Sequence, residues 1–163
     1  MDYTVFDFSR FTQLEELCIA NNSFLFVSEF RLEGLPELRA VFIGSNCFTK
    51  EKYRYNKDLA RSFRVQKCPR LEVIQIYERS FIDYAGDFVL AQLPALRTLA
   101  IGDLNRDSYN FFYCAAFTLR SRFSPSLSRA DLPQLQSVSL GKFCFQNSVR
   151  TVFQSRRRGK PGM

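Results

Sequence analysis

The chain has 163 residues, of which 46% are hydrophobic, and carries a formal net charge of +7 with 18 Phe, no Trp and no His. This length and composition are typical of one folded domain, and no run of about 18 apolar residues is present that would span a bilayer as a helix. Five cysteines without a CxxC spacing, in a chain without His, provide no zinc site. We therefore expect reduced thiols, a cytoplasmic location, and no metal or cofactor.

In chain order, the first feature is a repeated phrase: Leu or Cys, Pro, one residue, Leu, two residues, an aliphatic, one residue and a second aliphatic. An early copy contains Leu14, Leu17 and Ile19, with Phe11-Thr12 in place of the Leu-Pro pair. The full copies begin at Leu35-Pro36, Cys68-Pro69, Leu93-Pro94 and Leu132-Pro133. Because aliphatic side chains alternate with others at the end of the phrase, each copy predicts one short strand.

Recurrent phenylalanines follow each of these strands. One Phe comes five residues after the last aliphatic and is expected to fold back into the core; the fourth copy delays it to Phe112, and the other copies give Phe24, Phe48, Phe81 and Phe145. A Phe-x-aliphatic element comes next and predicts a second short strand in each unit: Phe30/Leu32, Phe63/Val65, Phe88/Leu90 and Phe117/Leu119.

The unit length follows from the leading leucines, which are separated by 24, 33, 25 and 39 residues: Leu14, Leu38, Leu71, Leu96 and Leu135. A basal unit of 24–25 residues therefore carries insertions near residues 49–62 and 103–131, which we expect to form loops. The predicted organisation is one repeat domain over residues 1–155 with five core units, followed by a basic, disordered tail over residues 156–163.

Both ends of the chain interrupt the repeat. Phe6-x-Phe8 matches the close of a preceding unit, and Phe153 begins another Phe-x-aliphatic element with Ser155 in the aliphatic position. Repeat arrays need polar terminal units for solubility. We therefore expect further repeats beyond this chain, or end-to-end self-association, or a partner chain that covers the ends. A gene fragment without function is the remaining possibility, and it would aggregate.

The chain resembles leucine-rich-repeat proteins, especially the divergent, Phe-rich arrays of microbial eukaryotes and their BspA-like relatives. The phrases that carry the resemblance are LPELRAVFIGSNCF, CPRLEVIQIYERSF, LPALRTLAIG and LPQLQSVSLGKFCF, and it covers about residues 6–154. It implies a mostly β solenoid with a parallel sheet on the concave face, short second strands and loops on the convex face, and little helix. The chain departs from the commonest form in having Gly44, Gly102 and Gly141 where an Asn ladder is usual.

The expected function is protein–protein interaction, because stacked strands present an extended surface of independently variable side chains. The residues expected to bind a protein partner on the concave face are Glu16, Phe42, Val73, Gln75, Tyr77, Thr98, Ser137 and Ser139. Ordinary sheet-surface residues are the alternative interpretation. No catalytic residues are predicted, since the chain has no nucleophile motif, no phosphate-binding Gly loop and no metal cluster.

A nucleic-acid-binding module is the second hypothesis, using the 50–70 insertion and the C-terminal tail. The insertion interleaves cations with tyrosines, a pattern that can bind phosphates and stack on bases. A solvated loop is the simpler interpretation of the same residues, which are Lys50, Lys52, Tyr53, Arg54, Tyr55, Lys57 and Arg61.

Overall fold

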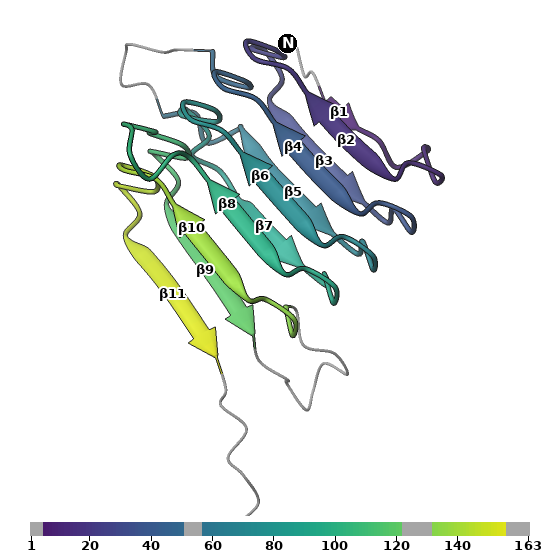
Figure 1. Ribbon diagram of the computed structural model, residues 1–163. Coiled ribbons are helices and arrows are strands. Elements are labelled where there is room, and N and C mark those ends of the chain that lie inside the picture. Colours follow the sequence, from purple (N-terminus) through teal and green to yellow (C-terminus); the bar gives the residue numbers. More distant parts are fainter. Residues whose placement is uncertain (1–4, 51–56, 122–131, 156–163) are drawn as a thin grey trace, which may run out of the picture.

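The fold is all-β in the part of the chain that the computed structural model describes, residues 5–50, 57–121 and 132–155. Within these ranges every regular element is a strand, and the paired strands run parallel. The predicted β-rich architecture with parallel sheets is confirmed. Successive strands from β1 to β8 alternate between two sheets that lie one behind the other (Figure 1).

Each unit of the repeat contributes one strand to each side of the molecule. The five-stranded sheet is made of β2 (Glu16–Ile19), β4 (Ala40–Ile43), β6 (Val73–Ile76), β8 (Thr98–Ile101) and β10 (Ser137–Leu140). The four-stranded sheet is made of β1 (Val5–Asp7), β3 (Glu29–Glu33), β5 (Ser62–Gln66) and β7 (Phe88–Ala91). Beside β7, the same side continues with β9 (Ala116–Ser121) and its partner β11 (Arg150–Ser155).

The register of the five-stranded sheet confirms the predicted alignment of the repeats. One column of direct neighbours is Leu17, Val41, Ile74, Leu99 and Val138, and the next is Ile19, Ile43, Ile76, Ile101 and Leu140. The leading leucines are also aligned. The residue after a leading leucine donates its backbone N–H to the carbonyl of the equivalent residue in the preceding unit, as Arg39 N does to Glu15 O and Arg97 N to Glu72 O. Each fully buried aliphatic side chain contributes about 1.5–3 kcal/mol through its burial between the sheets.

Two columns of stacked phenylalanines fill the end of the core. The first consists of Phe24, Phe48, Phe81, Phe111 and Phe145, with successive ring centroids 4.7–5.5 Å apart. The second runs through the four-stranded sheet as Phe6, Phe30, Phe63 and Phe88. Rings of one column meet rings of the other edge-on, for example Phe63 and Phe81 at 5.2 Å and 82°. Both geometries suit the quadrupole of the aromatic ring, so the columns reinforce each other.

Two predictions about individual phenylalanines are wrong. The fourth unit places Phe111, not Phe112, in the column, where Phe111 N donates to Phe81 O and the ring is buried. Phe112 instead contacts Tyr109 and Tyr113 outside the column. Near the end of the chain, the β9–β11 register sets Phe153 opposite Leu119, so Phe153 occupies the aliphatic position and not the Phe position.

Candidate functional site

The candidate site is the outer face of the five-stranded sheet. Alternation along each strand sends the aliphatic columns inward and leaves two rows of side chains facing solvent. One row is Glu16, Ala40, Val73, Thr98 and Ser137, and the other is Cys18, Phe42, Gln75, Ala100 and Ser139. The residues predicted to bind a partner all lie on this face, and each is at least partly exposed. The structure therefore places all eight of them on one face.

Tyr77 directly follows β6, and the residues at the equivalent position of the two neighbouring units are glycines, Gly44 and Gly102. The amide of Tyr77 donates to Ile43 O, while Gly44 N donates to Ile19 O and Gly102 N to Ile76 O, so all three continue the ladder by one residue. Neither glycine can be replaced without strain, because a Cβ on Gly44 would lie 2.5 Å from Asn21 Oδ1 and Gly102 has φ +77°. The two neighbouring units therefore carry no side chain at the positions that pair with Tyr77, whose own side chain is 45% exposed.

A hollow of about 490 Å³ lies beside Tyr77. Phe42 and Tyr77 are among the residues that line it, together with Gly44, and charged side chains are contributed by Glu78, Asp103 and Arg106. The hollow combines aromatic surface with a few polar groups, which is the usual composition of a binding site.

The loop after β8 supplies the charged groups of the hollow. Asp103 is oriented locally, since its Oδ1 accepts from Asn105 N at 2.7 Å, and its amide donates to Ser108 Oγ at 2.7 Å. Arg106 reaches back toward the sheet, with Nη1 3.8 Å from Glu78 Oε1 and Nε 3.9 Å from Asp103 Oδ2. The sequence predicted an insertion here, but no spacing rule indicated that Glu78, Asp103 and Arg106 would meet.

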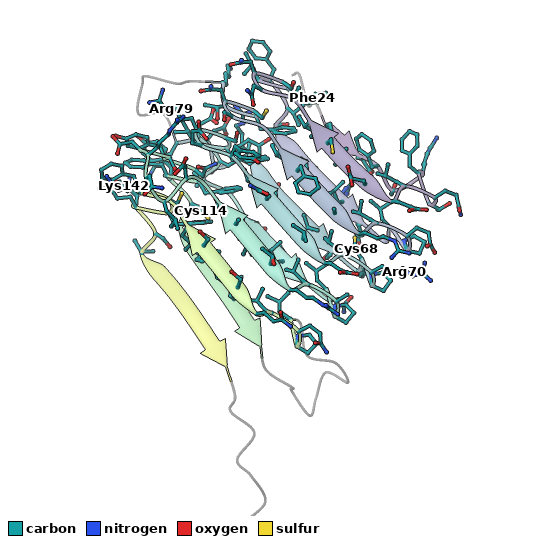
Figure 2. All side chains as sticks on the ribbon, viewed as in Figure 1. Phe24, Cys68, Arg70, Arg79, Cys114 and Lys142 are labelled. Carbon is teal, nitrogen blue, oxygen red and sulfur yellow. The ribbon has the colours of Figure 1, made fainter. Side chains whose placement is uncertain are left out.

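A ridge of residues in left-handed backbone conformation borders this end of the sheet. In each unit the residue two positions before the column Phe has φ between 55° and 62°, and these residues are Asn22, Asn46, Arg79, Tyr109 and Phe143. Asn tolerates this conformation, whereas other side chains pay about 1–2 kcal/mol. The rings of Tyr109 and Phe143 stack at 4.9 Å. Arg79 and Lys142 lie along this end of the strands, opposite Cys68 and Arg70 (Figure 2).

A second hollow, of about 460 Å³, joins the ridge to the sheet face. Its lining shares Glu78 and Arg106 with the first hollow and adds Asn46, Arg79, Asn105 and Asp107. Arg106 therefore stands between two depressions, and the sheet face and the ridge form one continuous hollowed surface.

The predicted basic loop is only partly supported by the structure. Lys52, Tyr53, Arg54 and Tyr55 lie outside the described residues, and Lys50 and Lys57 are exposed. Arg61 is the correction, because its side chain is 2% exposed and forms an ion pair with Asp83 at 2.7 Å.

Carbonyl groups from two turns complete the surroundings of Arg61. Its Nη2 donates to Leu25 O at 2.9 Å, Val27 O at 2.7 Å and Phe48 O at 3.0 Å. Its guanidinium lies 4.7 Å from the ring centre of Tyr84, and burial raises the pKa of the Tyr84 hydroxyl. A buried charge is tolerated when it is paired and hydrogen-bonded in this way. The Arg61 side chain is therefore part of the core and is not available to a phosphate group.

The cations that follow Arg61 are opposed by acids of neighbouring units. Arg64 pairs with Asp87, Arg70 with Glu37, and Lys67 with Glu33. The hydrogen bond from Lys67 holds the pKa of the Glu33 carboxyl below its usual value. The charge of each of these three cations is thus balanced by an acid of a neighbouring unit.

The remaining chemistry-bearing groups form no further site in the described ranges. All five cysteines are free thiols, of which Cys18 is exposed, and burial raises the pKa of Cys114 and of Cys144 to about 11. No cluster of His, Cys, Asp and Glu suited to a metal ion occurs among the described residues. The same residues include no helix with the length and apolar character needed to cross a membrane.

Comparison with known proteins gives no match to this chain among family models, curated proteins or solved structures.

Proposed function

We propose that this chain is a leucine-rich-repeat solenoid whose five-stranded sheet, with the loops at its end, binds another protein. The repeat supports the architecture: five units place one strand each in a parallel sheet, and the second strands of the same units form the other side. In this architecture the five-stranded sheet corresponds to the concave face, which is the surface such arrays use for binding.

The observation that carries the proposal is the hollow beside Tyr77. The Tyr77 side chain directly follows β6, next to glycines in both neighbouring units, and is exposed, and Phe42 lines the same hollow. Exposed aromatic residues in preformed depressions are frequent anchors of protein interfaces. Val73, Gln75, Thr98 and the two serines of β10 lie on the same sheet face and add small or polar groups, which suits the rim of an interface.

The nucleic-acid hypothesis has less support. Arg61 is buried and the next three cations, although exposed, are paired with acids, so fewer charges of the 50–70 segment are free of an acidic partner than its composition indicates. Under this hypothesis the binding constant should fall as salt is added. On duplex DNA, the slope of log K against the logarithm of the salt concentration should be about −0.9 per phosphate contact.

The experiment is an affinity capture with the full chain immobilised, followed by identification of the bound proteins by mass spectrometry. A specific partner should bind the unmodified chain and should be lost with the double variant Phe42→Ala/Tyr77→Ala. Phe26→Ala is the matched control, since Phe26 is a 68% exposed aromatic residue outside the sheet face. Capture that survives the double variant, or that is lost equally with Phe26→Ala, would contradict the proposal.

A further inference from the structure

We infer that the hollow beside Tyr77 receives a basic side chain, Arg or Lys, of a protein segment lying across the five-stranded sheet. The inference rests on the proposed binding function of this face and names the chemistry of its partner. The chain's own Arg106, which lines the hollow, is displaced when the segment binds.

The apolar part of the hollow suits the stem of such a side chain. Phe42 and Tyr77 come from neighbouring units of the repeat, and both rings line the hollow together with Gly44 and Asn21. The long methylene stems of Lys and Arg cover apolar surface while their charged ends remain near polar groups. The exposed Tyr77 ring also offers its face to a cation.

The charged part of the hollow has an excess of carboxylate. Glu78 and Asp103 line it, and Arg106 is the single cation in the lining. On the sheet face next to it, the Glu16 carboxylate accepts from Cys18 Sγ, and Cys18 also lines the hollow. A partner cation therefore complements the local charge, although the whole chain is basic.

Arg106 shows that these two carboxylates accept a guanidinium and that it is held loosely. Its contacts of 3.8 Å to Glu78 and 3.9 Å to Asp103 are longer than hydrogen bonds, and its side chain is 72% exposed. Exposed pairs of this kind contribute little to stability. A partner cation entering between Phe42 and Tyr77 can replace Arg106 at both carboxylates at small cost.

The opposite chemistry is an acidic segment that pairs with Arg106 itself. Such a segment would bring its carboxylate close to Glu78 and Asp103, and the repulsion disfavours it. The two possibilities make opposite predictions for the removal of Arg106.

The test is an NMR titration of the ¹⁵N-labelled full chain with three blocked tripeptides: acetyl-Ala-Arg-Ala-amide and its norleucine and glutamate counterparts. The arginine peptide should shift the amide signals of Gly44, Tyr77 and Gly102, and the other two should not. Arg106→Ala should increase affinity for the arginine peptide by about two- to fivefold, the equivalent of one exposed ion pair. Glu78→Gln and Asp103→Asn should each weaken it, and Arg70→Ala, an exposed ion-paired arginine at the other end of the strands, should leave it unchanged.

Stronger binding of the glutamate peptide than of the arginine peptide would overturn the inference in favour of an acidic partner. Loss of peptide binding in the Arg106→Ala variant would do the same. Equal binding of the norleucine peptide, or no binding of the arginine peptide to either protein, would also overturn it. These outcomes leave the proposed function intact if the captured partner is still lost with Phe42→Ala/Tyr77→Ala. If the double variant still captures the partner, the proposed function itself fails.

Discussion

Arg61 and Arg64 lie three residues apart and both pair with an aspartate, yet their replacement should affect stability very differently. The Arg61–Asp83 pair is 2.7 Å long and its side chains are 2% and 4% exposed, whereas the Arg64–Asp87 pair is 3.5 Å long and 36% and 76% exposed. Arg61→Met would leave the Asp83 carboxylate buried without its cation and would remove the donor to three carbonyls. Breaking a buried pair from one side costs about 3–5 kcal/mol.

The control is Arg64→Met, which should lower the free energy of unfolding by no more than about 1 kcal/mol, because the pair is solvent-exposed. The double variant Arg61→Met/Asp83→Asn removes both buried charges and should recover part of the loss seen in Arg61→Met. Urea unfolding followed by far-UV circular dichroism measures all three. A loss below about 1 kcal/mol for Arg61→Met, or equal losses for the two arginines, would refute the argument that burial decides.

Three further predictions concern packing, backbone strain and thiol reactivity. Phe81→Ala should lower the free energy of unfolding in urea by about 3–5 kcal/mol, because Phe81 is fully buried and stacks on both Phe48 and Phe111. Phe26→Ala should change it by no more than about 0.5 kcal/mol. Similar losses in the two variants would contradict the core assignment. Arg79→Asn should raise the melting temperature by relieving up to about 1 kcal/mol of strain at φ 61°, since Asn22 and Asn46 already occupy the same position, and a lower melting temperature would count against it. Iodoacetamide at pH 8 should label Cys18 first, because it is the exposed thiol. Cys114 and Cys144 should react only as the pH approaches their raised pKa of about 11. Mass spectrometry of peptides checks the order, and fast labelling of Cys114 would show that its burial is not maintained.

The rows of the sheet could be predicted from the sequence because the repeat fixes them. Once the leading leucines are aligned, the alternation of side chains in a strand decides which residues face inward, and the side-by-side positions of Phe42 and Gln75 follow. The exposure of Tyr77 follows in the same way, from glycines at the equivalent positions of the neighbouring units. These conclusions use only local periodicity and unit length.

The features that the sequence did not predict depend on contacts between distant residues. Arg61 lies in a run of cations, and nothing near it in the chain indicates that Asp83 and the Val27 carbonyl will surround it. The choice between Phe111 and Phe112 is similar, because both stand in an insertion of undetermined path. Asn110 settles this choice, because its side-chain Nδ2 donates to Tyr77 O at 2.7 Å and thereby places the next residue, Phe111, in the column.

The ring spacing in the phenylalanine columns has a consequence for how the array can change. Successive rings lie 4.7–5.5 Å apart, close to the distance of about 4.7–4.9 Å between neighbouring strands of a sheet. Side-chain stacking and main-chain pairing therefore advance by the same step, and a unit can be duplicated or deleted without creating a mismatch in either. Gain or loss of a unit would move the outward-facing residues by one rung, so such an array can acquire a new recognition surface while its interior stays the same.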